Sequence, residues 1–179
     1  NGIFWNLGEN CTANSRIIAH KDVYDDLVAA LENKIGDWKM GDQLDPETRN
    51  GPRVSETHYK KVAGLVETGK AQGARVVAGG DGAGGLVFQP TIFADVTADM
   101  DIFQKEIFGP VVGVTRAEKD EEAVALANGP EYGLAEKRYT SDIGQAHRYA
   151  RKLKAAAVGV HAYSDGETST PFGGVTEHV

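Results

Sequence analysis

The sequence contains a single cysteine, Cys11, among its 179 residues. One thiol can neither close a disulfide within the chain nor take part in a zinc site built from several cysteines. Cys11 is therefore either a packed core residue or a nucleophile. Because a disulfide framework is lacking, the composition fits a reducing compartment, and we expect a cytoplasmic protein.

Long apolar runs and an excess of positive charge are lacking as well. No stretch of about 18 apolar residues occurs, and no basic-then-apolar leader, so we expect neither a membrane span nor secretion. The 19 Lys and Arg residues against 26 Asp and Glu residues give a formal net charge of −7. This balance argues against nucleic acid as a partner. The five histidines show no ligand spacing, and we expect no metal site.

The remaining pattern alternates short apolar runs with amphipathic stretches, as in an α/β fold. We expect a mostly parallel sheet with helices on both faces, in which ligands collect at the carboxyl ends of the strands. The first helix should bury Val23, Leu27, Ala30 and Leu31 on one face. The expected strands are 15–20, 74–78, 111–115, 134–140 and 156–160, segment 86–94 is extended, and the expected helices are 22–35, 55–69, 118–128 and 142–153.

The residues around Cys11 favour a functional thiol. Gly8, Asn10, Thr12 and Asn14 are small and turn-prone, so Cys11 is expected on a loop just before a strand. Buried structural cysteines usually lie inside apolar runs, because a free cysteine packs like a small hydrophobic residue. The alternative, an inert core cysteine, remains open from residue types alone.

A second candidate is the segment Glu106-Ile107-Phe108-Gly109-Pro110, which precedes an apolar run. A carboxylate and an aromatic ring two residues apart in an extended turn could hold a ribose diol and pack on a flat ring. The alternative interpretation is a surface charge beside a core phenylalanine.

Six stretches in the same order resemble the catalytic domain of the aldehyde dehydrogenase superfamily. The amino-acid sequence around the thiol most resembles that of enzymes that oxidise ω-aminoaldehydes such as γ-glutamyl-γ-aminobutyraldehyde. We therefore expect residues 1–179 to be that domain alone, without the coenzyme-binding and oligomerisation segments. The six stretches are 4–16, 41–46, 89–93, 105–110, 126–135 and 171–174.

The resemblance implies a role for each matching residue. Cys11 matches the nucleophile that attacks the aldehyde carbon, and its backbone N–H would help to bind the oxyanion. Glu106 matches the residue that holds the nicotinamide ribose, and Phe108 matches the aromatic residue beside the nicotinamide. The substrate tunnel would be lined by Trp5, Asn10, Thr12, Tyr163 and Phe172.

The resemblance also implies what the chain lacks. In the family, the water-activating glutamate, an oxyanion-binding asparagine and the coenzyme domain lie upstream of the nucleophile. The parent would use NAD or NADP and form a homo-oligomer. For this chain alone we expect no bound coenzyme, a monomer and no aldehyde oxidation. The alternative is an excised or redesigned soluble domain that folds without catalysing anything, and a cysteine hydrolase would need a histidine near Cys11.

Charged residues stand where the family has apolar ones. They are Arg53 and the triplet Glu136-Lys137-Arg138. We hypothesise that these positions face surfaces that missing domains or subunits would cover, so that the polar replacements keep the domain soluble. Deliberate redesign and natural drift of a fragment would each explain the pattern.

Overall fold

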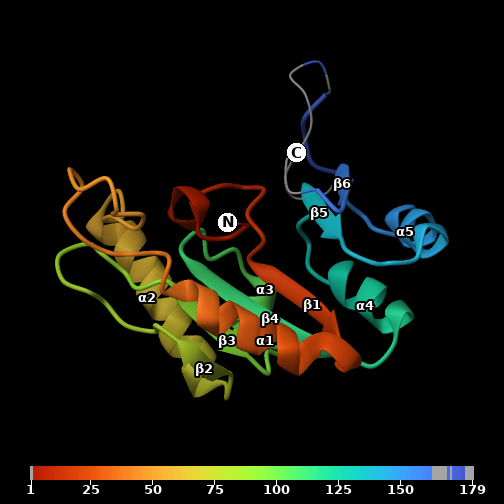
Figure 1. Cartoon of the computed structure of the whole chain (residues 1–179), viewed down its shortest axis with the longest axis horizontal. Helices are drawn as coiled ribbons and strands as arrows, with labels where there is room; N and C mark the ends of the chain where they lie inside the picture. The colour runs from red at the N-terminus through yellow and green to blue at the C-terminus, as the bar shows by residue number, and fades with distance from the viewer. Residues whose placement is uncertain (1, 163–168, 170, 176–179) are drawn as a thin grey trace.

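The computed structural model of the chain describes residues 2–162, 169 and 171–175. A four-stranded sheet in the order β1-β4-β3-β2 forms its centre (Figure 1). Strands β1 (Arg16–His20), β4 (Val111–Ala117) and β3 (Thr91–Ala94) run parallel, and β2 (Arg75–Ala78) adds an antiparallel edge. The mostly parallel α/β fold expected from the sequence is confirmed. The helical elements are η1 (Trp5–Gly8), α1 (Lys21–Ile35), α2 (Glu56–Ala71), α3 (Asp101–Gln104), α4 (Asp120–Ala127) and α5 (Ile143–Ala150).

The two central strands, β3 and β4, show no alternation of buried and exposed residues over most of their length, because both of their faces are covered. On one face Phe93 and Val111 pack against α2, which buries Val62 and Val66. On the other face the neighbouring strand residues pack against α1. That second core contains Ile92, Ala94, Val112, Val114, Tyr24 and Val28. The expectation of helices on both faces is therefore confirmed.

The buried face of helix α1 is shifted from the predicted one, since Leu27 and Leu31 pack against the core but Val23 and Ala30 are exposed. Val23 is 54% exposed, and the fully buried side chain is Tyr24, whose hydroxyl donates to Asp95 Oδ1 at 3.0 Å. Leu27 and Leu31 are only partly buried against this core. The prediction for Val23 was wrong because the tyrosine ring supplies more buried area and its hydroxyl finds a partner at the end of β3.

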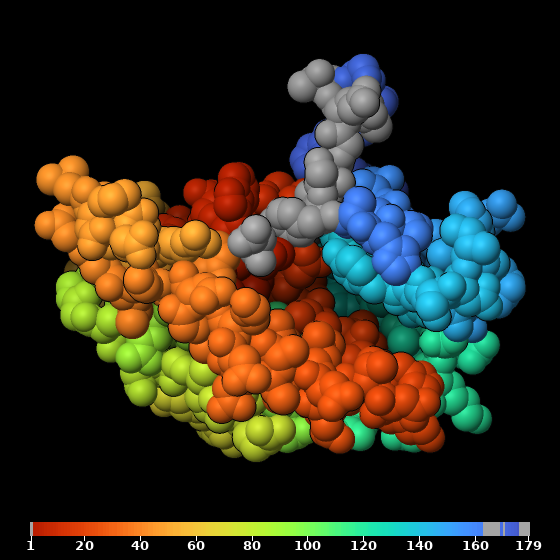
Figure 2. Space-filling model, viewed as in Figure 1, coloured from red at the N-terminus to blue at the C-terminus, as the bar shows by residue number. Residues whose placement is uncertain are grey.

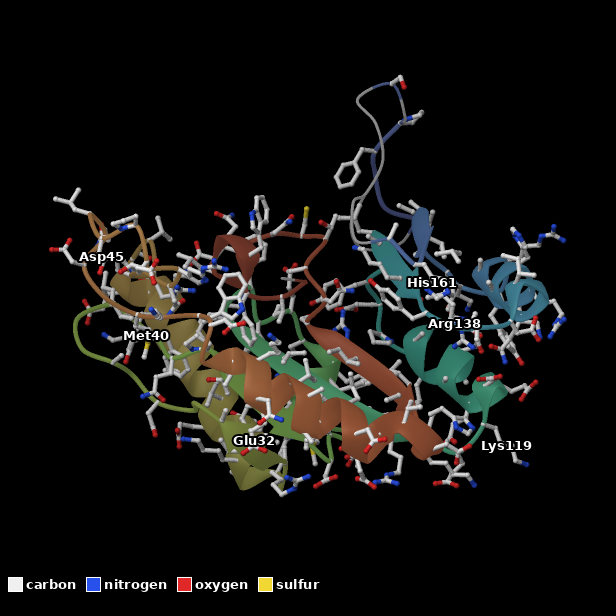
Figure 3. All side chains as sticks on the ribbon, in the orientation of Figure 1. Glu32, Met40, Asp45, Lys119, Arg138 and His161 are labelled. Atoms are coloured by element: carbon white, nitrogen blue, oxygen red, sulfur yellow. The ribbon has the colours of Figure 1, made fainter. Side chains whose placement is uncertain are left out.

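Strands β5 (Ala135–Arg138) and β6 (Ala157–Val160) form a separate parallel pair rather than an extension of the main sheet. This pair, together with α5, lies beside α4 and the N-terminal segment (Figure 1). Tyr149 of α5 donates to Glu121 of α4 at 2.9 Å, which ties this unit to the rest. Figure 3 shows Arg138 and His161 on this unit and Met40 and Asp45 on the loop after α1. Within the described residues no helix is long and apolar enough to cross a membrane.

Candidate active site

Cys11 lies in a tight turn, and its thiol is exposed. The turn is closed by the N–H of Ala13, which donates to the Asn10 carbonyl at 2.9 Å. The Asn10 side-chain oxygen accepts from the Thr12 N–H at 3.3 Å and from the Thr12 hydroxyl at 3.2 Å. Such local side-chain bonds are the reason that Asn and Thr favour turns. They hold Cys11 at the tip, as the loop prediction required.

The turn before Cys11 has an unusual backbone. Asn6, Leu7 and Gly8 all have positive φ angles, of 50°, 62° and 72°. Asparagine and glycine tolerate this left-handed region, but leucine does so rarely, and such strain persists only where surrounding contacts impose it. The guanidinium of Arg53 supplies one such contact by donating to the Leu7 carbonyl at 2.9 Å.

Gly8 joins the segment that carries Cys11 to the segment that carries Glu106 and Phe108. A Cβ atom at Gly8 would lie 2.1 Å from the carbonyl oxygen of Gly109. The two backbones therefore touch, and only glycine fits at this position. The sequence places these segments about 100 residues apart, and this main-chain contact brings them together.

In the segment that leads into β4, partly buried and buried side chains alternate. Ile107 is buried at 1% exposure, whereas Glu106 and Phe108 on either side of it are only partly buried. Phe108 has a φ of 56°, so the fully extended turn expected from the sequence was wrong at this residue. The Phe108 carbonyl accepts from His58 Nε2 at 2.7 Å, which holds this strained residue in place.

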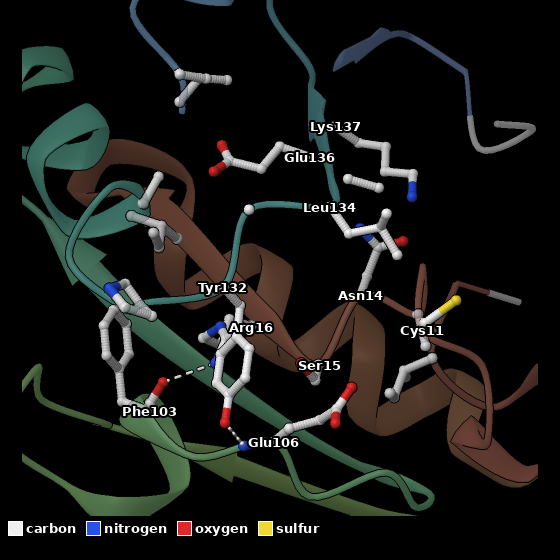
Figure 4. A pocket seen from close by; sticks show the side chains of 18 of the residues that line it. Cys11, Asn14, Ser15, Arg16, Phe103, Glu106, Tyr132, Leu134, Glu136 and Lys137 are labelled. Carbon is white, nitrogen blue, oxygen red and sulfur yellow. Dashed lines mark hydrogen bonds between the residues drawn. The ribbon is translucent and has the colours of Figure 1, made fainter. Parts of the chain in front are cut away.

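A cavity of about 170 Å³ lies between β1, α4 and β5. Cys11 and Asn10 line it together with Glu106 and Phe108. In Figure 4 the Cys11 sulfur points outward from this group of side chains, and Glu106 lies below Ser15. Figure 2 shows the surface hollowed between the N-terminal segment and the β5 region. The structure thus brings four of the predicted site residues to one cavity.

Of the other predicted tunnel residues, Trp5, Thr12 and Phe172 are not among the described residues that line this cavity. Trp5 is 54% exposed and Phe172 is 60% exposed, while Thr12 is buried and bonded to Asn10. Tyr163 lies outside the described residues. Their assignment to an aldehyde tunnel stays a prediction. Among the described residues no group of three or more His, Cys, Asp or Glu side chains could hold a metal ion.

Arg16 and Glu136, two partly buried charged residues, line the same cavity. Arg16 donates to the Phe103 carbonyl at 2.9 Å, and its guanidinium lies 5.5 Å from the centre of the Tyr132 ring. Burial raises the pKa of Glu136, and the Arg16 charge partly opposes that shift. Burial likewise lowers the pKa of Arg16. Because Arg16 and Glu136 are 120 positions apart, no local sequence pattern could have predicted that they line one cavity.

The charged triplet of β5 is compensated within the chain. Lys137 Nζ donates to the Thr12 carbonyl at 2.9 Å, and Arg138 pairs with Asp120 at 3.3 Å. Glu136 and Lys137 extend in opposite directions from the strand (Figure 4). All three side chains are partly buried, so a purely solubilising role for them stays a prediction.

The same hypothesis is wrong for Arg53. Its side chain is fully buried and pairs with Glu9, with 3.2 Å between Arg53 Nη1 and Glu9 Oε1. His58, in the first turn of α2, is also mostly buried, and its Nδ1 lies 3.8 Å from the same carboxylate oxygen. The sequence carried no signal for this cluster because Glu9 is 44 residues from Arg53 and 49 residues from His58.

Comparison with known proteins identifies relatives along the whole chain. A sequence model described as the aldehyde dehydrogenase family matches residues 1–177. Aminoacetaldehyde dehydrogenase from Pseudomonas aeruginosa is 40% identical over 177 residues, which cover 99% of this chain and 36% of that protein. Aldehyde dehydrogenase citD from Monascus ruber is 46% identical over 182 residues, with 98% and 36% covered.

Solved structures with a similar fold are also aldehyde dehydrogenases. The NAD+ complex of an aldehyde dehydrogenase from Bacillus cereus superposes with a TM-score of 0.93 at 41% identity, covering 98% of this chain and 36% of that one. The chain therefore spans about a third of the length of the proteins that it matches.

Proposed function

Because the chain belongs to the aldehyde dehydrogenase family, we propose that residues 1–179 are the catalytic domain of an NAD(P)+-dependent enzyme that oxidises an aldehyde to a carboxylic acid. The observation that carries this proposal is the meeting of Cys11, Glu106 and Phe108 at one cavity. The proposed nucleophile lies on one backbone segment, and the two side chains suited to a nicotinamide riboside lie on another. The two segments touch where Gly8 meets the Gly109 carbonyl.

Cys11 acts as the nucleophile in this proposal. Its thiolate sulfur bonds to the aldehyde carbon, and the former carbonyl oxygen becomes the oxyanion of a thiohemiacetal. No residue in the described part of the chain accepts a hydrogen bond from the Cys11 backbone N–H, so this donor is available to that oxyanion. Loss of hydride from the carbon leaves a thioester, and water cleaves it to the acid and the free thiol.

Glu106 and Phe108 would hold the coenzyme. A carboxylate only accepts hydrogen bonds, which suits a ribose diol, and the phenylalanine ring offers an apolar face beside it. Both residues line the cavity that Cys11 lines, whereas Ile107 between them is buried. Bound NAD(P)+ would supply the hydride acceptor.

We propose an ω-aminoaldehyde as the substrate of the parent enzyme. The sequence around the thiol resembles that subgroup, and one of the relatives is named aminoacetaldehyde dehydrogenase. An assay of the parent enzyme with aminoaldehydes and with straight-chain aldehydes of equal length would test this assignment.

For the chain by itself we propose no aldehyde oxidation and a monomeric state. Residues 1–179 correspond to only about a third of the length of the relatives, and the resemblance places the water-activating glutamate, the oxyanion-binding asparagine and the coenzyme domain of the family upstream of the matched nucleophile. The competing proposal is a folded scaffold without a functional thiol. Both predict no NADH formation, so an absorbance assay does not separate them.

Alkylation of Cys11 by iodoacetamide separates the two proposals. We expect the thiol of the folded chain to react faster than that of a peptide with residues 7–16, because the turn fixes it at an exposed tip. The Cys11→Ser variant should show no labelling. A rate equal to that of the peptide, in a chain that circular dichroism shows to be folded, would favour the scaffold.

A further inference from the structure

The cluster of Glu9, Arg53 and His58 contacts the nucleophile turn, and its members are not among the described residues that line the cavity. The Arg53 side chain has no exposed surface, although arginine is almost never fully buried unless it is paired. Its Nη2 donates to the Gly51 carbonyl at 2.9 Å and to Asn50 Oδ1 at 3.3 Å. These bonds fix one end of the guanidinium on the loop that precedes α2.

The other end of the guanidinium reaches the turn before Cys11. Arg53 Nη1 donates to the Leu7 carbonyl at 2.9 Å and lies 3.2 Å from Glu9 Oε1. Leu7 is the residue with the most unfavourable backbone angle for its type in this turn. Arg53 therefore binds the strained turn from both sides of Gly8, two and four residues before the nucleophile.

His58 extends the cluster to the second functional segment. A carbonyl oxygen only accepts, so His58 Nε2 carries a proton and donates to the Phe108 carbonyl at 2.7 Å. Its other nitrogen faces Glu9 Oε1 at 3.8 Å. The cluster therefore contacts the nucleophile turn and the Phe108 backbone at the same time.

The cluster is poorly explained as a source of stability. Glu9 Oε1, Arg53 Nε and His58 Nδ1 are all buried, and each lacks a hydrogen-bond partner among the described residues. Burial lowers the pKa of Arg53, with the Glu9 charge opposing it, so burial disfavours the charged form. Buried ion pairs are often no more stable than apolar residues of the same volume, and some are kept for the geometry that they impose.

We propose that Arg53 is a positioning residue for Cys11. Its guanidinium imposes the left-handed turn at Leu7, and through that turn it sets the direction of the Cys11 backbone N–H. Glu9 and His58 hold the same geometry against the Phe108 segment. This inference rests on the proposed nucleophilic role of Cys11 and adds a residue to it at a position where the family resemblance predicted an apolar side chain.

The orientation of the Cys11 N–H can be measured by comparing two reactions of the thiol. Alkylation by iodoacetamide forms no oxyanion. With p-nitrophenyl acetate, the sulfur bonds to the carbonyl carbon, the ester C–O bond breaks, p-nitrophenolate leaves, and the thiol proton passes to solvent. This acylation passes through an oxyanion that the N–H stabilises. The ratio of the two rate constants cancels exposure and thiolate fraction.

The test variant is Arg53→Lys, which keeps the charge but loses the forked donor geometry. We expect its acylation-to-alkylation ratio to fall by about tenfold, the size expected for release of one strained backbone contact. The exposed Arg151→Lys is the matched control and should leave the ratio unchanged. Adding Leu7→Gly to Arg53→Lys should restore most of the ratio, because glycine adopts the left-handed angle without support.

Glu9→Gln provides a second test if Arg53→Lys does not fold. It keeps the shape of the side chain, removes the charge that faces Arg53, and should lower the ratio by a smaller factor. An unchanged ratio in the folded variants, with a wild-type ratio above that of the 7–16 peptide, would overturn only the positioning role. A wild-type ratio equal to that of the peptide would overturn the proposed function and this role together.

Discussion

At the scale of single residues, Gly8 has the most restricted position in the site. It combines a φ of 72° with a carbonyl oxygen 2.1 Å from where a Cβ would stand. We expect Gly8→Ala to lower the free energy of unfolding by more than about 2 kcal/mol, because strain and a backbone clash act together. Urea denaturation measures this loss.

Gly36→Ala is the matched control for this substitution. Gly36 has a φ of −61°, and nothing lies within 4 Å of a Cβ built there. Alanine at this position should be neutral or slightly stabilising. If Gly8→Ala and Gly36→Ala unfold at the same urea concentration, the contact between the two functional segments is not as tight as described.

Residue types predicted part of the site and missed the rest for a physical reason. Cys11 and Glu106 stand in short, recognisable surroundings, and the structure places both at one cavity. Arg53 and Arg16 have partners far along the chain, Glu9 and the Phe103 carbonyl, and such contacts leave no local pattern. The roles of the predicted residues stay predictions until the thiol is tested.

At the scale of elements, Asp95 ties together α1, β2 and the end of β3. Its carboxylate accepts from Arg75 Nε at 2.8 Å and from the Tyr24 hydroxyl at 3.0 Å. The Arg75 hydrogen bond, with a smaller contribution from Tyr24, lowers the pKa of Asp95 below its ordinary value of 3.8. The network therefore stabilises the charged carboxylate of the folded chain.

This shift predicts a pH dependence of stability. In the window below pH 3.8 the unfolded chain binds a proton that folded Asp95 still lacks, so the free energy of unfolding rises with pH there. Its contribution is complete above that window and is lost as pH falls through the lowered pKa. Asp95→Asn should cost about 0.5 to 1 kcal/mol at pH 7, as for partly exposed ion pairs.

The measurement is urea denaturation at pH 7, 4 and 3, with the exposed Asp26→Asn as control. The difference between wild type and Asp95→Asn should shrink at pH 3. Asparagine accepts the left-handed backbone at this position (φ 58°) as aspartate does, so the comparison isolates the charge. A difference that does not depend on pH would contradict the assigned hydrogen bonds.

Elements with clear periodicity were predicted well, and short or charged ones were not. The helix that begins after Ser55 was placed correctly because Ser55 accepts from the His58 N–H, as an N-cap should. Helix α3 and turn η1, each of four residues, are too short to show a period. The charges of β5 concealed that, among the residues that the structure describes, it pairs with β6 and not with the main sheet.

At the scale of the whole molecule, the described part of the chain divides into a sheet with two cores and a separate β5–β6–α5 unit. Every residue of β3 is buried, whereas no residue of β5 or β6 is fully buried. Side-chain hydrogen bonds attach this unit to the rest of the chain. Lys137 donates to the Thr12 carbonyl, and Tyr149 donates to Glu121 of α4. Such regions open before the global unfolding of a domain.

Native-state hydrogen exchange should reveal this division. We expect amides of β5 to open with a free energy at least about 1 kcal/mol below that of β4, whose amides should report global unfolding. Urea at concentrations below the unfolding transition should bring the two values together. Equal opening energies in the absence of urea would show that the chain unfolds as one unit.

The main-chain contact between Gly8 and Gly109 has a consequence for redesigning this protein. Because the sulfur is located by backbone atoms, the side chains at 106 and 108 can be exchanged without moving it. Saturation libraries at these two positions would vary the lining of the cavity beside a fixed Cys11 turn, whereas libraries at 8 or 109 would mostly yield chains that fail to fold.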